Sequence, residues 1–120
     1  MPHTRRETID VPTDGSGAAD VRFGAFNGLV LSVEYVKAAA DSYADGVDFA
    51  ITGGLGGQSI WAEDDVDASK SVAPVRAGSL TDGSDSAMTE MPIGLHDEPV
   101  RIVIANGGAN RTGRFIVTVV

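Results

Sequence analysis

The chain of 120 residues contains no cysteine, few aromatic residues and no long hydrophobic run. The absence of cysteine excludes disulfide bonds, thiolate nucleophiles and zinc sites with cysteine ligands. No segment approaches the roughly 20 apolar residues that a membrane-spanning helix needs, and no apolar stretch typical of a signal peptide follows the charged start of the chain. Because aromatic residues are only 6% of the composition, the core is expected to consist mainly of valine, isoleucine, leucine and alanine.

Basic residues are also scarce, with nine lysines and arginines against 17 aspartates and glutamates and a formal net charge of −8. This balance argues against direct binding to nucleic acid or to an anionic membrane, since both favour lysine and arginine. Arginines gather near the two ends of the chain, while acidic residues dominate positions 41–97. The acidic middle could bind a partner with basic patches, or it could simply keep the protein soluble.

Glycine is abundant, with 15 residues, and five of them follow an aspartate or asparagine. Such pairs favour tight turns because both residue types accept positive φ at little steric cost. They separate short segments in which apolar residues occupy alternate positions, the pattern of strands with one buried face. The pairs are Asp14-Gly15, Asn27-Gly28, Asp45-Gly46, Asp82-Gly83 and Asn106-Gly107. The pattern predicts one all-β domain over residues 1–120, an antiparallel β-sandwich or barrel of about seven or eight strands with little helix.

The alternation predicts strands at residues 4–11, 19–23, 29–36, 47–51, 58–62, 99–105 and 113–120, and a further edge strand at 72–76, where Pro74 excludes a central position. Residues 91–95 form a short apolar stretch. Residues 1–8 are expected to be an N-terminal arm or part of the first strand, and residues 24–28 a turn. Residues 77–90, the longest stretch without apolar periodicity, are predicted to form a polar loop, and loops of this length are usually functional or mobile. The expected core includes Leu31, Val33, Phe49, Ile51, Ile102, Ile104, Phe115 and Val117.

Two segments allow a chemical interpretation, and each also has a simpler one. The glycine-rich run at residues 53–57 could cradle a phosphate, but no helix is expected after it, so a hairpin connection is favoured. The acidic residues Glu63, Asp64, Asp65 and Asp67 could bind a divalent cation, although their run lacks the glycine and terminal glutamate of an EF-hand loop. A solvated acidic loop is the preferred interpretation.

No catalytic residue, cofactor site or metal site is predicted anywhere in the chain. The two histidines, His3 and His96, are not accompanied by a nucleophile motif, so the sequence does not indicate an enzyme. Trp61 is the only tryptophan, and it could be either an anchor for a partner or a residue of the core.

Four groups of segments together resemble small virion proteins encoded among the head genes of tailed bacteriophages and prophages. They are residues 4–9 with 12–17, 35–37 with 43–53, 59–63 with 67–69, and 101–108 with 111–115. The distinctive stretches are Ala-Asp-Gly-Val-Asp-Phe at 44–49 and Ile-Val-Ile-Ala-Asn-Gly-Gly at 102–108. The resemblance spans most of the chain, and these stretches are typical of strands and turns, not of catalytic sites.

This resemblance implies a capsid cement (decoration) protein. Such a protein would bind the shell of major capsid protein on the outer surface of the virion, form a homotrimer and be made in the host cytoplasm. A head-completion or head–tail connector role at the neck is the alternative. A rival from another class is a small glycan- or metal-binding β module that uses the acidic run. The residues expected to contact partners are Arg5, Arg6, Glu7, Trp61, Asp82 and Asp85.

Overall fold

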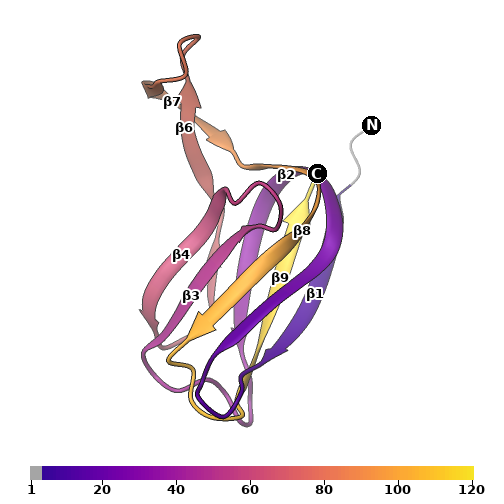
Figure 1. The fold of residues 1–120 in the computed structure, drawn as a ribbon, viewed down its shortest axis with the longest axis vertical. Helices are drawn as coiled ribbons and strands as arrows, with labels where there is room; N and C mark the ends of the chain where they lie inside the picture. Colours follow the sequence, from indigo (N-terminus) through magenta and orange to yellow (C-terminus); the bar gives the residue numbers. More distant parts are fainter. Residues whose placement is uncertain (1–3) are drawn as a thin grey trace.

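The computed structural model describes residues 4–120 (Figure 1), so His3 and the first residues of the predicted N-terminal arm lie outside the described part. Residues 4–120 form no helix. Their nine strands are β1 (Arg5–Pro12), β2 (Ala19–Lys37), β3 (Val47–Gly53), β4 (Ser59–Val66), β5 (Lys70–Val72), β6 (Val75–Ser79), β7 (Asp85–Pro92), β8 (Gly94–Ala105) and β9 (Thr112–Val119). The prediction of one antiparallel all-β domain is confirmed.

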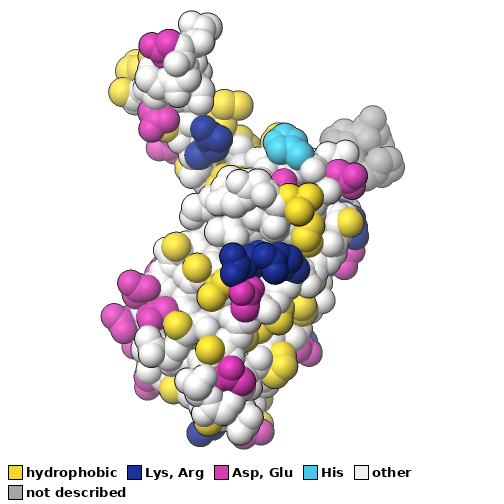
Figure 2. Space-filling model, in the orientation of Figure 1, with side chains coloured by type: hydrophobic (Ala, Val, Ile, Leu, Met, Phe, Trp, Pro, Cys, Tyr) yellow, Lys and Arg dark blue, Asp and Glu magenta, His cyan; other side chains and the backbone are white. Residues whose placement is uncertain are grey.

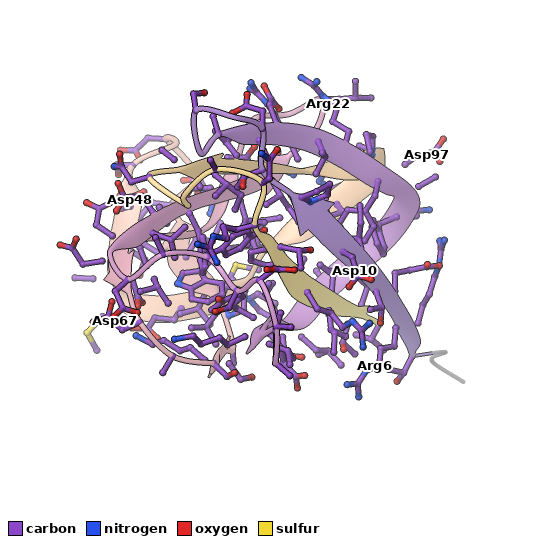
Figure 3. The ribbon with its side chains drawn as sticks, turned by 90° about the horizontal axis from the view of Figure 1, so that it is seen from below. Arg6, Asp10, Arg22, Asp48, Asp67 and Asp97 are labelled. Atoms are coloured by element: carbon purple, nitrogen blue, oxygen red, sulfur yellow. The ribbon has the colours of Figure 1, made fainter. Side chains whose placement is uncertain are left out.

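Two antiparallel sheets that share strand β2 form the body of the molecule. One sheet has the order β5-β2-β9-β1, and the other has the order β2-β8-β3-β4. Strand β2 belongs to both because it is 19 residues long: its first half pairs with β8 and its second half with β9 and β5. The curled sheets face each other as a sandwich that resembles a flattened barrel when seen from below (Figure 3).

The turn predicted at residues 24–28 is wrong, because the chain continues through this segment as part of β2. The pairing of β2 with β8 shifts register on both sides of Phe26, so the strand is bulged here instead of folding back. Gly24 and Gly28 have φ angles of 70° and 142°, which residues with a side chain rarely adopt. These glycines therefore mark a bend within one strand, whereas the other four Asx-Gly pairs lie between strands.

The core contains the residues that the alternation predicts, with one exception. Seven of the eight expected core residues are buried, and the exception is Leu31, which is 42% exposed. At the centre of the core, the ring of Phe49 lies 4.8 Å from that of Tyr35, 5.0 Å from that of Phe115 and 5.7 Å from that of Trp61, measured between centroids. Aromatic residues are few in the sequence, but they are concentrated at this point.

Leu31 is exposed because β2 contains a second bulge. The register between β2 and β9 shifts between Val30 and Ser32, which leaves Leu31 as an extra residue without a partner in the ladder. The alternation therefore changes phase, and Val30 and Val33 are both buried. The prediction for Leu31 is wrong because an uninterrupted period of two does not hold across this bulge.

Residues 77–90, which the sequence predicts as a polar loop, instead form most of a two-stranded hairpin. Strands β6 and β7 pair with each other and project from one end of the sandwich (Figure 1). Their pairing is irregular: from the pair Ala77–Glu90 to the pair Ser79–Asp85 the chain advances two residues on β6 but five on β7. The apolar alternation that identifies a strand in a sequence is absent here because the projecting hairpin has no buried face along its length: every residue of β7 except Ser86 is exposed.

Candidate functional site

The β6–β7 hairpin, residues 75–92, is the candidate interaction surface and is called the hairpin arm below. Val75 pairs with Pro92 at its base, and Ser79 pairs with Asp85 near its tip. Contacts between the arm and the sandwich are sparse, and those between β7 and β2 are among them. An isolated two-stranded hairpin is only marginally stable in water, so the arm would gain stability from a partner.

Large hydrophobic side chains are exposed along the hairpin arm. Within residues 4–120, eight large hydrophobic side chains are exposed, and four of them belong to the arm: Val75, Leu80, Met88 and Met91. Met88, in the irregular part of β7, is 93% exposed. Figure 2 shows hydrophobic side chains gathered on the arm. Single exposed hydrophobic residues are common, but a cluster on a projecting element indicates an interaction site.

A groove lies at the base of the hairpin arm, where the arm meets the sandwich. Its volume is about 350 Å³, and it is lined by Leu29, Arg76, Ala77, Ser79, Met91, Pro92, Gly94 and His96. The lining is apolar at Leu29, Met91 and Pro92, and Arg76 and His96 supply polar groups. No carboxylate is among these described lining residues. Two of the lining residues, Ala77 and Ser79, pair with Glu90 and Asp85 across the hairpin, so carboxylates flank this base groove.

The tip of the hairpin arm is acidic and its shape is determined by Asp82. The Asp82 carboxylate accepts hydrogen bonds from the amide and the hydroxyl of Ser84 at 2.9 and 2.6 Å. These bonds, led by that of the hydroxyl, hold the pKa of Asp82 below its usual value. The amide of Leu80 donates to the carbonyl of Ser84 at 2.7 Å, and Asp85 begins β7 directly afterwards. Asp82 and Asp85, both predicted partner contacts, therefore lie together at the tip.

The other predicted contacts near the N-terminus are part of the sandwich. Arg5, Arg6 and Glu7 lie in β1, so residues 5–7 form a strand and not a free arm. The Arg5 Nε donates to the Glu7 carboxylate at 2.8 Å, and Arg6, labelled in Figure 3, lies 3.4 Å from the Glu34 carboxylate. The Arg5 guanidinium also lies 5.0 Å from the ring centroid of Phe26. These charges already have intramolecular partners.

Trp61 lies in the core of the sandwich, which is one of the two roles that the sequence left open. Its side chain is buried against Phe49, and its indole Nε1 donates to the Glu63 carboxylate at 3.3 Å. The sequence leaves both a core role and a role as partner anchor open, because the residues around Trp61 show no clear apolar alternation. Pairing of β4 with β3 places Trp61 opposite Ile51 and so accounts for its position in the core, while its role as a partner contact stays a prediction.

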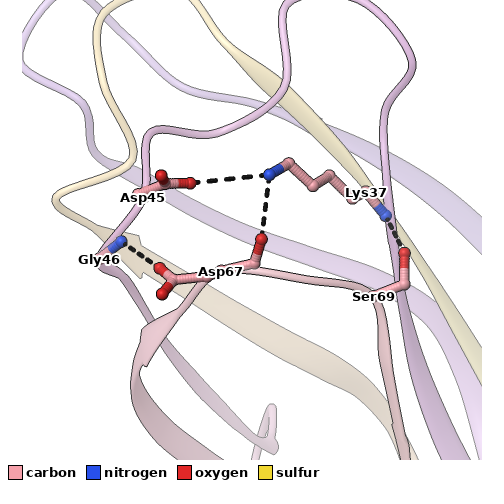
Figure 4. Close-up of polar contacts among 5 residues, drawn as sticks. All are labelled: Lys37, Asp45, Gly46, Asp67 and Ser69. Carbon is pink, nitrogen blue, oxygen red and sulfur yellow. Dashed lines mark hydrogen bonds and ion pairs between the residues drawn. The ribbon is translucent and has the colours of Figure 1, made fainter.

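The acidic run makes separate contacts that connect neighbouring segments. Glu63 pairs with Lys70 at 2.7 Å, and Asp67 accepts a hydrogen bond from the Gly46 amide at 2.9 Å (Figure 4). The Lys37 ammonium donates to the backbone carbonyl of Asp67 at 2.9 Å. Within residues 4–120, no three histidine, aspartate or glutamate side chains come together in a way that could hold a metal ion. These contacts of the acidic run connect segments of the sandwich to one another.

The glycine-rich loop between β3 and β4 donates hydrogen bonds to the carboxylate of Glu98, a residue of β8. The amides of Leu55 and Gly56 donate to one oxygen of Glu98 at 3.2 and 3.0 Å. The His96 amide and the Gln58 side chain donate to its other oxygen at 2.9 and 3.3 Å. Glu98 is only 2% exposed, and these bonds, led by that of Gly56, lower its pKa to about 2. The predicted hairpin connection is confirmed, and a carboxylate occupies the place considered for a phosphate.

Comparisons with known proteins do not identify the class of this protein. No protein-family model matches the chain, and no curated protein matches it at a significant level. Residues 4–120 contain no helix that is long and apolar enough to cross a membrane. The fold and the candidate surface together define a small antiparallel β-sandwich with a projecting, partly apolar hairpin arm.

Proposed function

We propose that this chain is a structural protein of a tailed-phage virion, a capsid cement protein that binds the shell of major capsid protein and stabilises it. Two observations support this proposal. The first is the resemblance of four groups of segments to small virion proteins of such phages. The second, which carries the proposal, is the hairpin arm, whose apolar side chains have no cover in the isolated chain.

The physical requirements of a cement protein match this architecture. A packaged genome presses outward on the shell, so bonds that connect neighbouring subunits stabilise the particle without any chemistry. The sandwich offers a rigid body, and the hairpin arm reaches beyond the footprint of that body (Figure 1). Burying the apolar side chains of the arm on the particle would contribute about 25 cal/mol for each Å² removed from water.

The proposal is tested by mixing the purified chain with empty capsids of the phage that encodes it. We expect the chain to sediment with the capsids, to cover the whole shell in electron micrographs, and to raise the temperature at which the capsids break open. Binding as a single ring at one vertex would support the neck-connector role instead. Failure to bind either the shell or the neck would overturn the assignment to the virion.

A variant without the hairpin arm sharpens this test. Residues 76–91 are replaced by a short Gly-Ser-Gly linker, since Val75 and Pro92 are already neighbours across the hairpin. We expect this armless variant to remain folded and to lose most of its binding to capsids. As a matched control, a variant with Asp45→Asn and Asp64→Lys alters exposed charges on the sandwich and should bind normally. Full binding by the armless variant would show that the arm is not the assembly element.

A further inference from the structure

Two arginines lie directly opposite each other on the outer face of the sheet β2-β8-β3-β4. Arg22 of β2 pairs with Arg101 of β8, so both side chains lie on the same face of the sheet. Like charges in directly opposite positions destabilise a sheet. Figure 2 shows basic side chains together in the middle of one face of a molecule whose net charge is −8. A second positive charge beside Arg101 therefore does not stabilise the isolated chain and needs another explanation.

Arg101 has a partner within the chain, whereas Arg22 has none in its described part. The Arg101 guanidinium donates from Nε and Nη2 to the two oxygens of the Asp20 carboxylate at 2.9 and 2.6 Å. Within residues 4–120, the Arg22 side chain forms neither an ion pair nor a hydrogen bond. Arg22 is exposed and points away from the sandwich (Figure 3). Because Arg101 already neutralises Asp20, the net positive charge of this group is that of Arg22.

Small side chains make up the neighbouring part of this face. Arg101 pairs with Thr52 of β3, and Val103, the next outward residue of β8, pairs with Ala50. Thr52, Val103 and Ala50 are all partly exposed. They leave room for the backbone of a partner close to the sheet, and Val103 and Ala50 offer apolar area beside the charge. The surface called the arginine face below consists of Arg22, Arg101, Thr52, Val103 and Ala50.

The chemistry of the arginine face favours a carboxylate of a protein over a nucleic acid. A guanidinium binds a carboxylate through two parallel hydrogen bonds, which fixes the orientation of the partner. A nucleic acid is a polyanion, and both the Asp20 carboxylate and the acidic surface of the whole molecule would repel it. Arginine beside small apolar groups is also typical of the centre of protein–protein interfaces.

A protein that connects neighbouring shell subunits needs a second contact surface away from the hairpin arm. The arginine face lies on the side of the sandwich, whereas the arm projects from its end (Figure 1). We propose that the arginine face binds an acidic segment of the major capsid protein, with a carboxylate of that segment paired with Arg22 and its apolar groups packed on Val103 and Ala50. This inference rests on the capsid role proposed above and adds a second site to it.

The experiment compares the binding of purified variants to empty capsids of the phage that encodes the chain. Arg22→Glu reverses the charge that faces the acidic segment, so it should bind at least about tenfold more weakly than the wild type. Arg111→Glu is the matched control, because Arg111 is exposed in the turn between β8 and β9 and forms no ion pair within residues 4–120. This control makes the same change in net charge and should bind normally. A further variant, Ala50→Gln, leaves every charge in place but adds bulk to the arginine face, and it should also weaken binding.

Electron cryomicroscopy of capsids decorated with the wild-type chain identifies what covers the arginine face. We expect an aspartate or glutamate of the major capsid protein within hydrogen-bond distance of the Arg22 guanidinium. Circular dichroism confirms that the variants are folded.

The outcomes separate this inference from the capsid role. If the wild-type chain binds capsids and Arg22→Glu binds equally well, or loses no more than Arg111→Glu, the inference is overturned while the capsid role stands. The same holds if the arginine face is open to solvent on the particle or covered by a second copy of the chain. If the wild-type chain does not bind capsids, the capsid role fails and the inference fails with it.

Discussion

At the scale of single residues, Glu98 connects two segments that lie far apart in the sequence. Its carboxylate, carried by β8, accepts hydrogen bonds from the amides of Leu55 and Gly56 in the β3–β4 loop. The loop can approach so closely because Gly53 has no side chain: a Cβ there would lie 2.6 Å from the Glu98 carboxylate. The carboxylate takes the role that a bound phosphate has in other glycine-rich loops.

Replacing Glu98 by glutamine should lower the free energy of unfolding by about 2 kcal/mol, because hydrogen bonds to a charged acceptor are lost and an amide group faces backbone donors. Urea denaturation near neutral pH measures this change. The Glu90→Gln variant, at an exposed position on the hairpin arm, is the matched control and should change stability by less than about 0.5 kcal/mol. Equal stability of the two variants would contradict this role of Glu98.

The same carboxylate predicts how stability depends on pH. The pKa of Glu98 is lowered from 4.5 to about 2 in the folded protein. Because the folded pKa is the lower one, the carboxylate stabilises the fold fully above the unfolded pKa and loses this effect as pH falls through the folded value. The difference in melting temperature between wild type and Glu98→Gln should therefore shrink from about pH 5 to about pH 2. A difference that stays constant over this range would rule out the predicted titration.

At the scale of elements, β2 organises the molecule because it enters both sheets. Its bulges around Phe26 and at Leu31 change both its direction and the phase of its alternation. The hairpin arm shows a related effect, since extra residues on β7 interrupt the pairing with β6. The bulges of β2 and the irregular pairing of β6 with β7 are therefore the features that distinguish this sandwich from one with regular strands.

The bulge at Leu31 makes a prediction about two residues that the alternation treats alike. Ile51 is fully buried, so Ile51→Ala should cost about 3 kcal/mol through lost burial and the cavity that remains. Leu31 is exposed, so Leu31→Ala should cost less than about 0.5 kcal/mol. Urea denaturation compares the two variants. A large loss of stability in the Leu31 variant would mean that β2 has no bulge at this position.

At the scale of the whole molecule, strands from the two ends of the chain lie beside each other. Strand β9 lies between β1 and β2, and the pairing runs from Arg5 opposite Val119 to Pro12 opposite Thr112. The sandwich therefore depends on contacts between residues that are separated by most of the sequence. Folds dominated by such contacts form slowly and as one unit, because loop closure must precede the pairing.

Removal of β9 should prevent folding altogether. Deleting residues 113–120 separates β1 from the rest of its sheet and takes Phe115 and Val117 out of the core, so circular dichroism should show an unfolded chain. The armless variant is the control, because it loses a longer segment, 76–91, that contacts the sandwich only sparsely. It should unfold cooperatively at a melting temperature close to that of the wild type. If the armless variant were unfolded and the variant without residues 113–120 were folded, the fold would depend on the hairpin arm and not on β9.

The sequence by itself determined the fold class and most of the core. Alternation and Asx-Gly turns depend on local backbone preferences, so they predicted an antiparallel all-β domain and seven of eight core residues. They also placed Asp82 and Asp85 on a partner surface, and that part of the prediction remains to be tested.

Only the tertiary structure decided where the strands bend and what covers each side chain. The continuity of β2 through Gly24 and Gly28, the exposure of Leu31 and the burial of Trp61 all depend on partner strands that are distant in the sequence. The same is true of Glu98, whose acceptor role arises when the β3–β4 loop is folded against β8. A bulge changes the phase of a strand without a strong local signal, because its geometry is set by the ladder across from it.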